Sequence, residues 1–163
     1  MTVNNKRSFF HLIAISTIMV FTACNTTDFF NEYQSLSDGW KKNEPVVFDF
    51  ESLDTLKTYD AYLNIRTTNE YPYSNLFVIV KMTEPEGATM MDTLQYEMAN
   101  PDGSMMGSGF TDIKEHKLVW RKNISLKKQG VYTIEVNHAT RKINEVNGDV
   151  VLNGVTEIGL QLQ

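Results

Sequence analysis

The feature that most constrains this chain is an alternation of apolar and polar residues with a period of two, repeated in short stretches over residues 46–162. Val46–Phe50 and Val155–Leu162 show it near the two ends of that range. Successive side chains of a β-strand point to opposite faces, so this pattern is typical of strands with one buried face. No long stretch has the 3.6-residue period of a helix. We therefore expect an all-β fold.

Turn-forming residues divide the pattern into seven or eight strands. Asn100-Pro101-Asp102-Gly103 is a strong turn sequence, because proline fixes φ and glycine accepts a positive φ. Gln129-Gly130 is expected to close a hairpin. Leu76–Met82 is apolar at nearly every position, as in a central strand covered on both faces. We expect an antiparallel β-sandwich, jelly-roll or immunoglobulin-like, with a closed small barrel as the alternative that the pattern leaves open.

The N-terminus has the three zones of a secretory signal peptide. Lys6 and Arg7 supply positive charge, and a mostly apolar stretch of 13 residues follows from Phe9 to Phe21. A helix needs about 20 residues to span a bilayer, so this stretch is too short to do so, but it has the length of a secretory hydrophobic region. Small residues then precede Cys24, as in a lipobox. We expect cleavage before Cys24.

Cys24 is the single cysteine of the chain, so no intramolecular disulfide can form. An exported chain with one cysteine needs a partner for it, and attachment of a diacylglyceryl group to the thiol supplies one. The alternatives are an uncleaved N-terminal anchor and a buried, inert cysteine. We expect Cys24 to be the lipid attachment site, because its position, its flanking residues and its being the single cysteine agree. Several acyl chains would then anchor the protein firmly, where one holds only marginally.

These signals divide the chain into three parts. We predict a lipoprotein signal peptide over 1–23, a tether over 24–35 and a β-sandwich domain over 36–163. Within them, Phe29–Leu36 fits either an edge strand or a short helix, and Ala139–Val146 fits one short helix. No acidic or lysine-rich run follows the cysteine directly. We therefore expect a lipid-anchored protein of the cell envelope, on the periplasmic face of the outer membrane.

Charge and motifs exclude several classes of function. Without Lys6 and Arg7, 13 basic residues remain against 20 acidic ones, so we expect no nucleic-acid partner. No nucleophile elbow, zinc-protease motif or phosphate-binding loop is present. His116 and His138 have no metal-ligand spacing, and we expect one on a solvated turn and the other at a strand end. We predict a protein without enzyme activity, metal or cofactor, with a small hydrolase as the least favoured alternative.

Three aromatic residues form a candidate interaction surface. Tyr71 and Tyr73 flank a proline, and together with Trp40 they could make an exposed platform that stacks on sugars or on a partner protein. Packing in the core is the commoner fate of aromatic side chains. Exposure of Tyr71 and Tyr73 would decide between the two.

Two further patterns have a structural and a functional interpretation. The basic run over Lys114–Lys128 fits a docking patch, but we favour the solvated face and turn of a hairpin, which protects an edge strand from aggregation. Asp54-Thr55-Leu56 and Asp92-Thr93-Leu94 match a short O-glycosylation pattern of exported Bacteroidetes proteins, with Thr55 and Thr93 as the acceptors.

The sequence resembles the GldH-type gliding-motility lipoproteins of Bacteroidetes over nearly all of the mature chain. The most distinctive stretch is Tyr71–Phe77, and the resemblance includes Gly39-Trp40, Leu63–Arg66, Val155–Leu160 and the lipidated Cys24. It implies a membrane lipoprotein associated with envelope motility and secretion proteins, and no enzyme activity. Members also occur in Bacteroidetes that do not glide. We expect a non-catalytic protein that binds envelope motility or secretion proteins, or alternatively a glycan-binding module.

Overall fold

The computed structural model describes residues 28–109, 112–142 and 147–163. Within these ranges the chain is all β, and no helix is long and apolar enough to cross a membrane. The strands are β1 (Phe30–Ser35), β2 (Trp40–Lys41), β3 (Val46–Ser52), β4 (Thr58–Thr67), β5 (Asn75–Thr83), β6 (Thr89–Glu97), β7 (Lys114–Ser125), β8 (Gly130–His138), β9 (Val151–Leu152) and β10 (Val155–Leu162).

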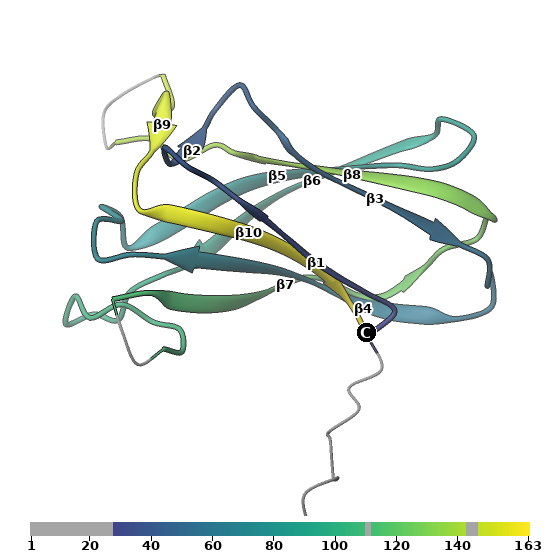
Figure 1. The fold of residues 1–163 in the computed structure, drawn as a ribbon, viewed down its shortest axis with the longest axis horizontal. Coiled ribbons are helices and arrows are strands. Elements are labelled where there is room, and N and C mark those ends of the chain that lie inside the picture. The colour runs from purple at the N-terminus through teal and green to yellow at the C-terminus, as the bar shows by residue number, and fades with distance from the viewer. Residues whose placement is uncertain (1–27, 110–111, 143–146) are drawn as a thin grey trace, which may run out of the picture.

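The eight longer strands form two antiparallel sheets packed face to face, which confirms the β-sandwich (Figure 1). One sheet has the order β1-β10-β4-β7 and the other β3-β8-β5-β6, while β2 and β9 pair as a separate ribbon. The first of the eight strands pairs with the last, the second with the seventh, the third with the sixth and the fourth with the fifth. This nested pairing is the jelly-roll arrangement. Of the topologies that the sequence left open, the jelly roll is the one adopted.

The core lies between the sheets and consists of the apolar half of each alternating strand. Phe48, Ile134 and Val80 face it from one sheet, and Leu63 and Leu160 from the other. Each of these side chains is fully or almost fully buried. The alternation predicted from the sequence is therefore the alternation between core and solvent.

Three local expectations need correction. The segment Phe29–Leu36 is a strand: β1 lies inside 24–35, the range assigned to the tether, so the folded part begins before residue 36. The helix predicted over 139–146 is absent from its described part, Ala139–Lys142, because the Ala139 N–H donates to the Phe77 carbonyl (2.8 Å) and extends the pairing of β8 with β5. Strand β5 is central, but its outward side chains are half-exposed, not covered.

The sandwich has two ends of different construction. The proximal end holds Asp28 and Phe29, the C-terminal Gln163 and the short connections 53–57, 84–88 and 126–129. The strand register brings them together, since Phe30 pairs with Leu162 and Ser52 with Gly130.

The distal end holds the four longer connections, 36–45, 68–74, 98–113 and 139–154, which include the β2–β9 ribbon. Figure 1 shows this ribbon at the opposite end of the sheets from the C-terminus. The two ends therefore face away from each other along the strands.

Candidate interaction site at the distal end

The three aromatic residues predicted as an interaction surface all belong to the distal end. Trp40 lies in β2, and Tyr71 and Tyr73 lie in the connection between β4 and β5. The rings of Tyr71 and Tyr73 pack edge to face, with centroids 6.2 Å apart. Cys24 lies outside the described residues, and its lipidation stays a prediction.

Trp40 is completely buried, so it is not part of an exposed platform. Its strand pairs with β9, where Leu152 lies opposite, and its ring packs edge to face on His138 at 5.4 Å. The indole Nε1 has no hydrogen-bond partner among the described residues. Trp40 instead anchors the β2–β9 ribbon to the end of β8.

Tyr71 is also buried, so of the two alternatives for this residue the structure shows packing in the core and not an exposed platform. Its hydroxyl donates a hydrogen bond to the Asn75 carbonyl (2.7 Å), and burial raises its pKa far above the usual value of 10. Gly154 fits against its backbone: a Cβ there would lie 2.3 Å from the Tyr71 nitrogen, and Gly154 has a φ of +77°. Tyr71 therefore packs the β4–β5 connection against the turn between β9 and β10.

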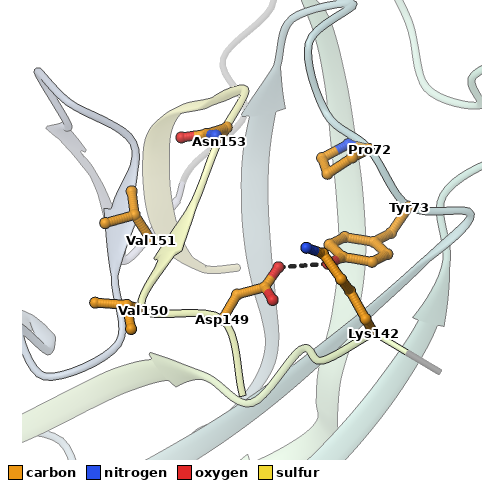
Figure 2. Close-up of a pocket in the computed structure, with 7 residues that line it drawn as sticks. All are labelled: Pro72, Tyr73, Lys142, Asp149, Val150, Val151 and Asn153. Carbon is orange, nitrogen blue, oxygen red and sulfur yellow. Dashed lines mark hydrogen bonds between the residues drawn. The ribbon is translucent and has the colours of Figure 1, made fainter. Parts of the chain in front are cut away.

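Tyr73 is half-buried and lines an open pocket of about 450 Å³. The other lining residues come from the same connection and from the segment before β10: Pro72, Lys142, Asp149, Val150, Val151 and Asn153. Figure 2 shows Asp149 directed toward the Tyr73 hydroxyl, which donates a hydrogen bond to its Oδ2. Lys142 lies beside the ring, with Val150, Val151 and Asn153 along the other wall.

The wall that holds Asp149 is fixed by hydrogen bonds to the end of β8. The Asp149 N–H donates to the Thr140 carbonyl (3.0 Å), and the buried Thr140 accepts the Phe77 N–H through its Oγ1 (3.2 Å). Hydrogen bonds of this kind hold an irregular segment in place without regular pairing. Hydrogen bonds therefore hold the Asp149 wall of the pocket in place.

The chemistry of the pocket suits binding. It offers a carboxylate, an ammonium group, an amide and an aromatic ring, together with two valine side chains. No cluster of three or more metal-ligating side chains occurs in the described part of the chain. Aromatic and apolar side chains with a few polar groups among them are the usual lining of a pocket that binds a small molecule.

Sequence reasoning missed the residues opposite Tyr73. Asp149, Lys142 and Asn153 lie about 70 residues or more beyond the tyrosine in the sequence, and no motif links them to it. The polar stretch Asn147-Gly148-Asp149 indicates a turn, which is the only local signal for this wall.

Both histidines of the domain are buried at or near this end, which corrects the solvated turn expected for His116. His116 lies in β7, and its Nε2 hydrogen-bonds with the Thr67 hydroxyl (3.1 Å). Burial lowers the pKa of both imidazoles. For His138, the Trp40 backbone and Asp149 oppose this effect more weakly, and Lys42 adds to it.

The basic run over Lys114–Lys128 does not form the predicted hairpin, because β7 and β8 belong to different sheets, and it extends from the distal end to the proximal end. Arg121 forms two hydrogen bonds with Asp92 of the facing sheet (2.6 and 2.7 Å), and Trp120 donates a third to the same carboxylate (2.9 Å). Lys128 pairs with Glu84 and Glu86 of the β5–β6 connection, at the proximal end of the same sheet. Much of the charge is therefore used to join elements of the fold.

The two glycosylation patterns differ in accessibility. Thr93 is exposed on the outer face of β6, whereas Thr55 is half-buried in the β3–β4 connection. Both hydroxyls stay predicted acceptor sites.

Comparison with known proteins gives a consistent result over the whole domain. A family model described as "GldH lipoprotein" matches residues 28–162. Gliding motility lipoprotein GldH of Flavobacterium johnsoniae is 40% identical over 152 residues, which cover 93% of this chain and 94% of that protein. A gliding motility lipoprotein GldH homolog of Christiangramia forsetii is 37% identical over 158 residues, 97% of each chain.

Among solved structures, the VP2 subviral particle of infectious bursal disease virus aligns with a TM-score of 0.35 at 11% identity. The alignment covers 81% of this chain and 32% of the viral one, so this chain spans about a third of its length. A likeness of this degree supports no conclusion about function.

Proposed function

The chain belongs to the GldH lipoprotein family, and we propose from this premise that it is a non-catalytic lipoprotein, anchored through Cys24, that binds envelope motility or secretion proteins with its distal end. The relatives are named for gliding motility and for lipidation. The lipid would hold the domain on the periplasmic face of the outer membrane. Confinement at a membrane raises the effective concentration of the protein for partners in the same envelope.

The Tyr73 pocket is the observation on which the choice of the distal end rests. Its walls combine a half-buried aromatic ring with a carboxylate, an ammonium group and apolar side chains. Tyrosine is one of the residue types that dominate binding energy in protein interfaces. The buried Trp40 and Tyr71 behind it keep the pocket preformed, which reduces the ordering cost of binding.

Site-specific crosslinking in live cells tests the proposal. A photoreactive amino acid in place of Asn153, an exposed pocket residue, should crosslink to envelope proteins that co-purify with the lipidated chain. The matched control is the same substitution at Val131, an exposed residue at the start of β8 near the proximal end. Equal crosslinking at both positions, or none at position 153 in correctly lipidated protein, would contradict the distal-end assignment.

The lipid anchor is tested separately by intact-mass analysis of the protein from native membranes. We expect an N-terminal Cys24 that carries fatty acids, and Cys24→Ser should remain unlipidated and appear in the soluble fraction. A mature chain that starts at Met1 without acyl groups would refute the anchor without bearing on the pocket.

Glycan binding is the second candidate, favoured by the Tyr73 ring beside the Asp149 carboxylate and the Asn153 amide. Sugars stack on aromatic rings and hydrogen-bond with such groups. Binding to a glycan array that is lost in Tyr73→Ala but kept in Tyr62→Ala, a half-buried tyrosine on the outer face of β4, would favour this candidate.

A further inference from the structure

Two leucine side chains at the proximal end lie almost entirely in solvent. Leu56 is 93% exposed and Leu53 is 68% exposed, both in the short connection between β3 and β4. Single exposed apolar residues are common on protein surfaces. Here, however, two leucines project from one loop of five residues, and the partly exposed Phe29 belongs to the same end of the sandwich.

The loop that presents the leucines is held by hydrogen bonds at both of them. The Leu56 N–H donates to Asp54 Oδ1 (2.9 Å), and Gln129 Nε2 donates to the Leu53 carbonyl (3.0 Å). Asp54 also pairs with Lys57 at 3.5 Å. Because these hydrogen bonds fix the backbone of the loop, the exposure of the two leucine side chains is a feature of the fold.

The short distance along the chain from Cys24 to the proximal end indicates what covers the two leucines. Only four residue steps separate Cys24 from Asp28, and an extended chain of that length reaches at most about 14 Å. Phe29 is already fixed in the fold, since its N–H donates to the Leu162 carbonyl (2.8 Å) and its ring stacks on Tyr59 at 4.5 Å. A lipid on Cys24 therefore brings the proximal end to within one short tether of the bilayer.

Charge at the proximal end does not oppose contact with lipid. The Asp54 carboxylate is paired with Lys57, and Lys128 lies between Glu84 and Glu86. Lys127 is exposed on the same end. The carboxylates of these loops are therefore largely neutralised by lysines.

We propose that the β3–β4 connection, through Leu53 and Leu56, is a membrane-contacting loop that inserts into the interfacial region of the bilayer to which the chain is anchored. This inference rests on the proposed lipid anchor at Cys24. Contact at these leucines orients the sandwich, so that its strands point away from the membrane and the distal pocket faces the aqueous compartment. Apolar side chains held beside a lipid anchor add to membrane binding in proportion to the area they bury.

The test uses the lipidated full-length protein in vesicles of phosphatidylethanolamine and phosphatidylglycerol. Because Cys24 is the only cysteine and its thiol is acylated, an engineered cysteine is the one thiol available for labelling. Leu56→Cys is labelled with a polarity-sensitive fluorophore, and lipids with nitroxide groups in the acyl chains serve as the quencher. Val150→Cys is the matched control, because Val150 is 74% exposed at the distal end.

We expect a blue shift and at least a twofold stronger lipid quenching at position 56 than at position 150. Weak quenching at position 56, or equal quenching at both positions, would overturn the membrane-contacting loop. Co-flotation of the protein with the vesicles reports the anchor independently: protein that fails to float refutes the anchor, whereas protein that floats without quenching at position 56 refutes only the loop. Unchanged thermal unfolding of both variants confirms that they are folded.

Discussion

The two ends of the sandwich differ in whether their connections bury large apolar and aromatic side chains. At the proximal end, short connections leave Leu53 and Leu56 in solvent. At the distal end, longer connections bury Trp40 and Tyr71 and leave the half-buried Tyr73 at the edge of a pocket. The strands between them are continuous, so the difference lies in the loops alone.

This comparison shows that the longer connections of a jelly roll bury large aromatic side chains that the short ones do not. The connections of five residues or fewer join consecutive strands, and they place Leu126 in the core but leave Leu53 and Leu56 outside it. The distal connections are long enough to form the β2–β9 ribbon, which brings Trp40 against His138 and Leu152. The distal connections therefore contribute several side chains to the core, whereas the β3–β4 connection at the proximal end leaves its two leucines outside it.

The largest expected effect that tests this contrast is that of Trp40→Ala. It removes a fully buried side chain and leaves a cavity at the end of β8, so we expect the free energy of unfolding to fall by about 3–5 kcal/mol. Leu56→Ala at the proximal end should change it by about 0.5 kcal/mol or less. Urea denaturation measures both, and similar values for the two variants would contradict the comparison.

A matched pair of glycines tests the packing of the distal turn. Gly154 and Gly87 have similar positive φ values, +77° and +85°, but a Cβ at Gly87 meets nothing within 4 Å while one at Gly154 meets the Tyr71 backbone. We expect Gly87→Ala to cost about 1 kcal/mol for its left-handed backbone, and Gly154→Ala about 2–4 kcal/mol because the clash is added. Equal costs would show that the β4–β5 connection yields freely. Chemical denaturation of both variants is the measurement.

Acidification should weaken the distal end first. Burial lowers the pKa of His116 and His138 below the usual 6.5, so the unfolded chain binds protons before the folded one does. The stability contributed by the neutral histidines is full above about pH 6.5 and is lost as the pH falls through the lowered values. Hydrogen exchange at pH 7.5 and 5.5 should show a larger loss of protection around β2 and β9 than around the β3–β4 connection. A uniform change, or stability that rises on acidification, would contradict this.

The smallest expected effect compares two tyrosine–aspartate contacts. Tyr73→Phe removes the hydrogen bond to Asp149 in the pocket, and we expect a loss of about 1 kcal/mol because the acceptor is charged but the site is partly open. Tyr62→Phe removes a longer contact to Asp60 of 3.5 Å on the outer face of β4, with a loss below about 0.5 kcal/mol. Urea denaturation measures both losses, and a loss for Tyr73→Phe no larger than that for Tyr62→Phe would show that the hydrogen bond to Asp149 adds little to stability.

The sequence predicted the sandwich because period-two alternation is a local property that burial enforces at every strand. Phe48, Leu63 and Ile134 occupy the core positions that their spacing predicts. It left two alternatives for Trp40 and Tyr71, burial and an exposed platform, because neither lies in a long alternating stretch and each is buried by segments distant in sequence. The same limit applies to His116, which pairs with Thr67 from a strand 49 residues away.

The sequence by itself determined the strands, their inward faces and the family, because each depends on residues near one another in the chain. Tertiary structure alone decided the jelly-roll order, the distal pocket between Tyr73 and Asp149, and the placement of Leu53 and Leu56 at the end where the chain leaves Cys24. These features depend on which strands pair and which loops meet. An alternating pattern specifies which face of a strand is buried, but it does not specify which strand pairs with it.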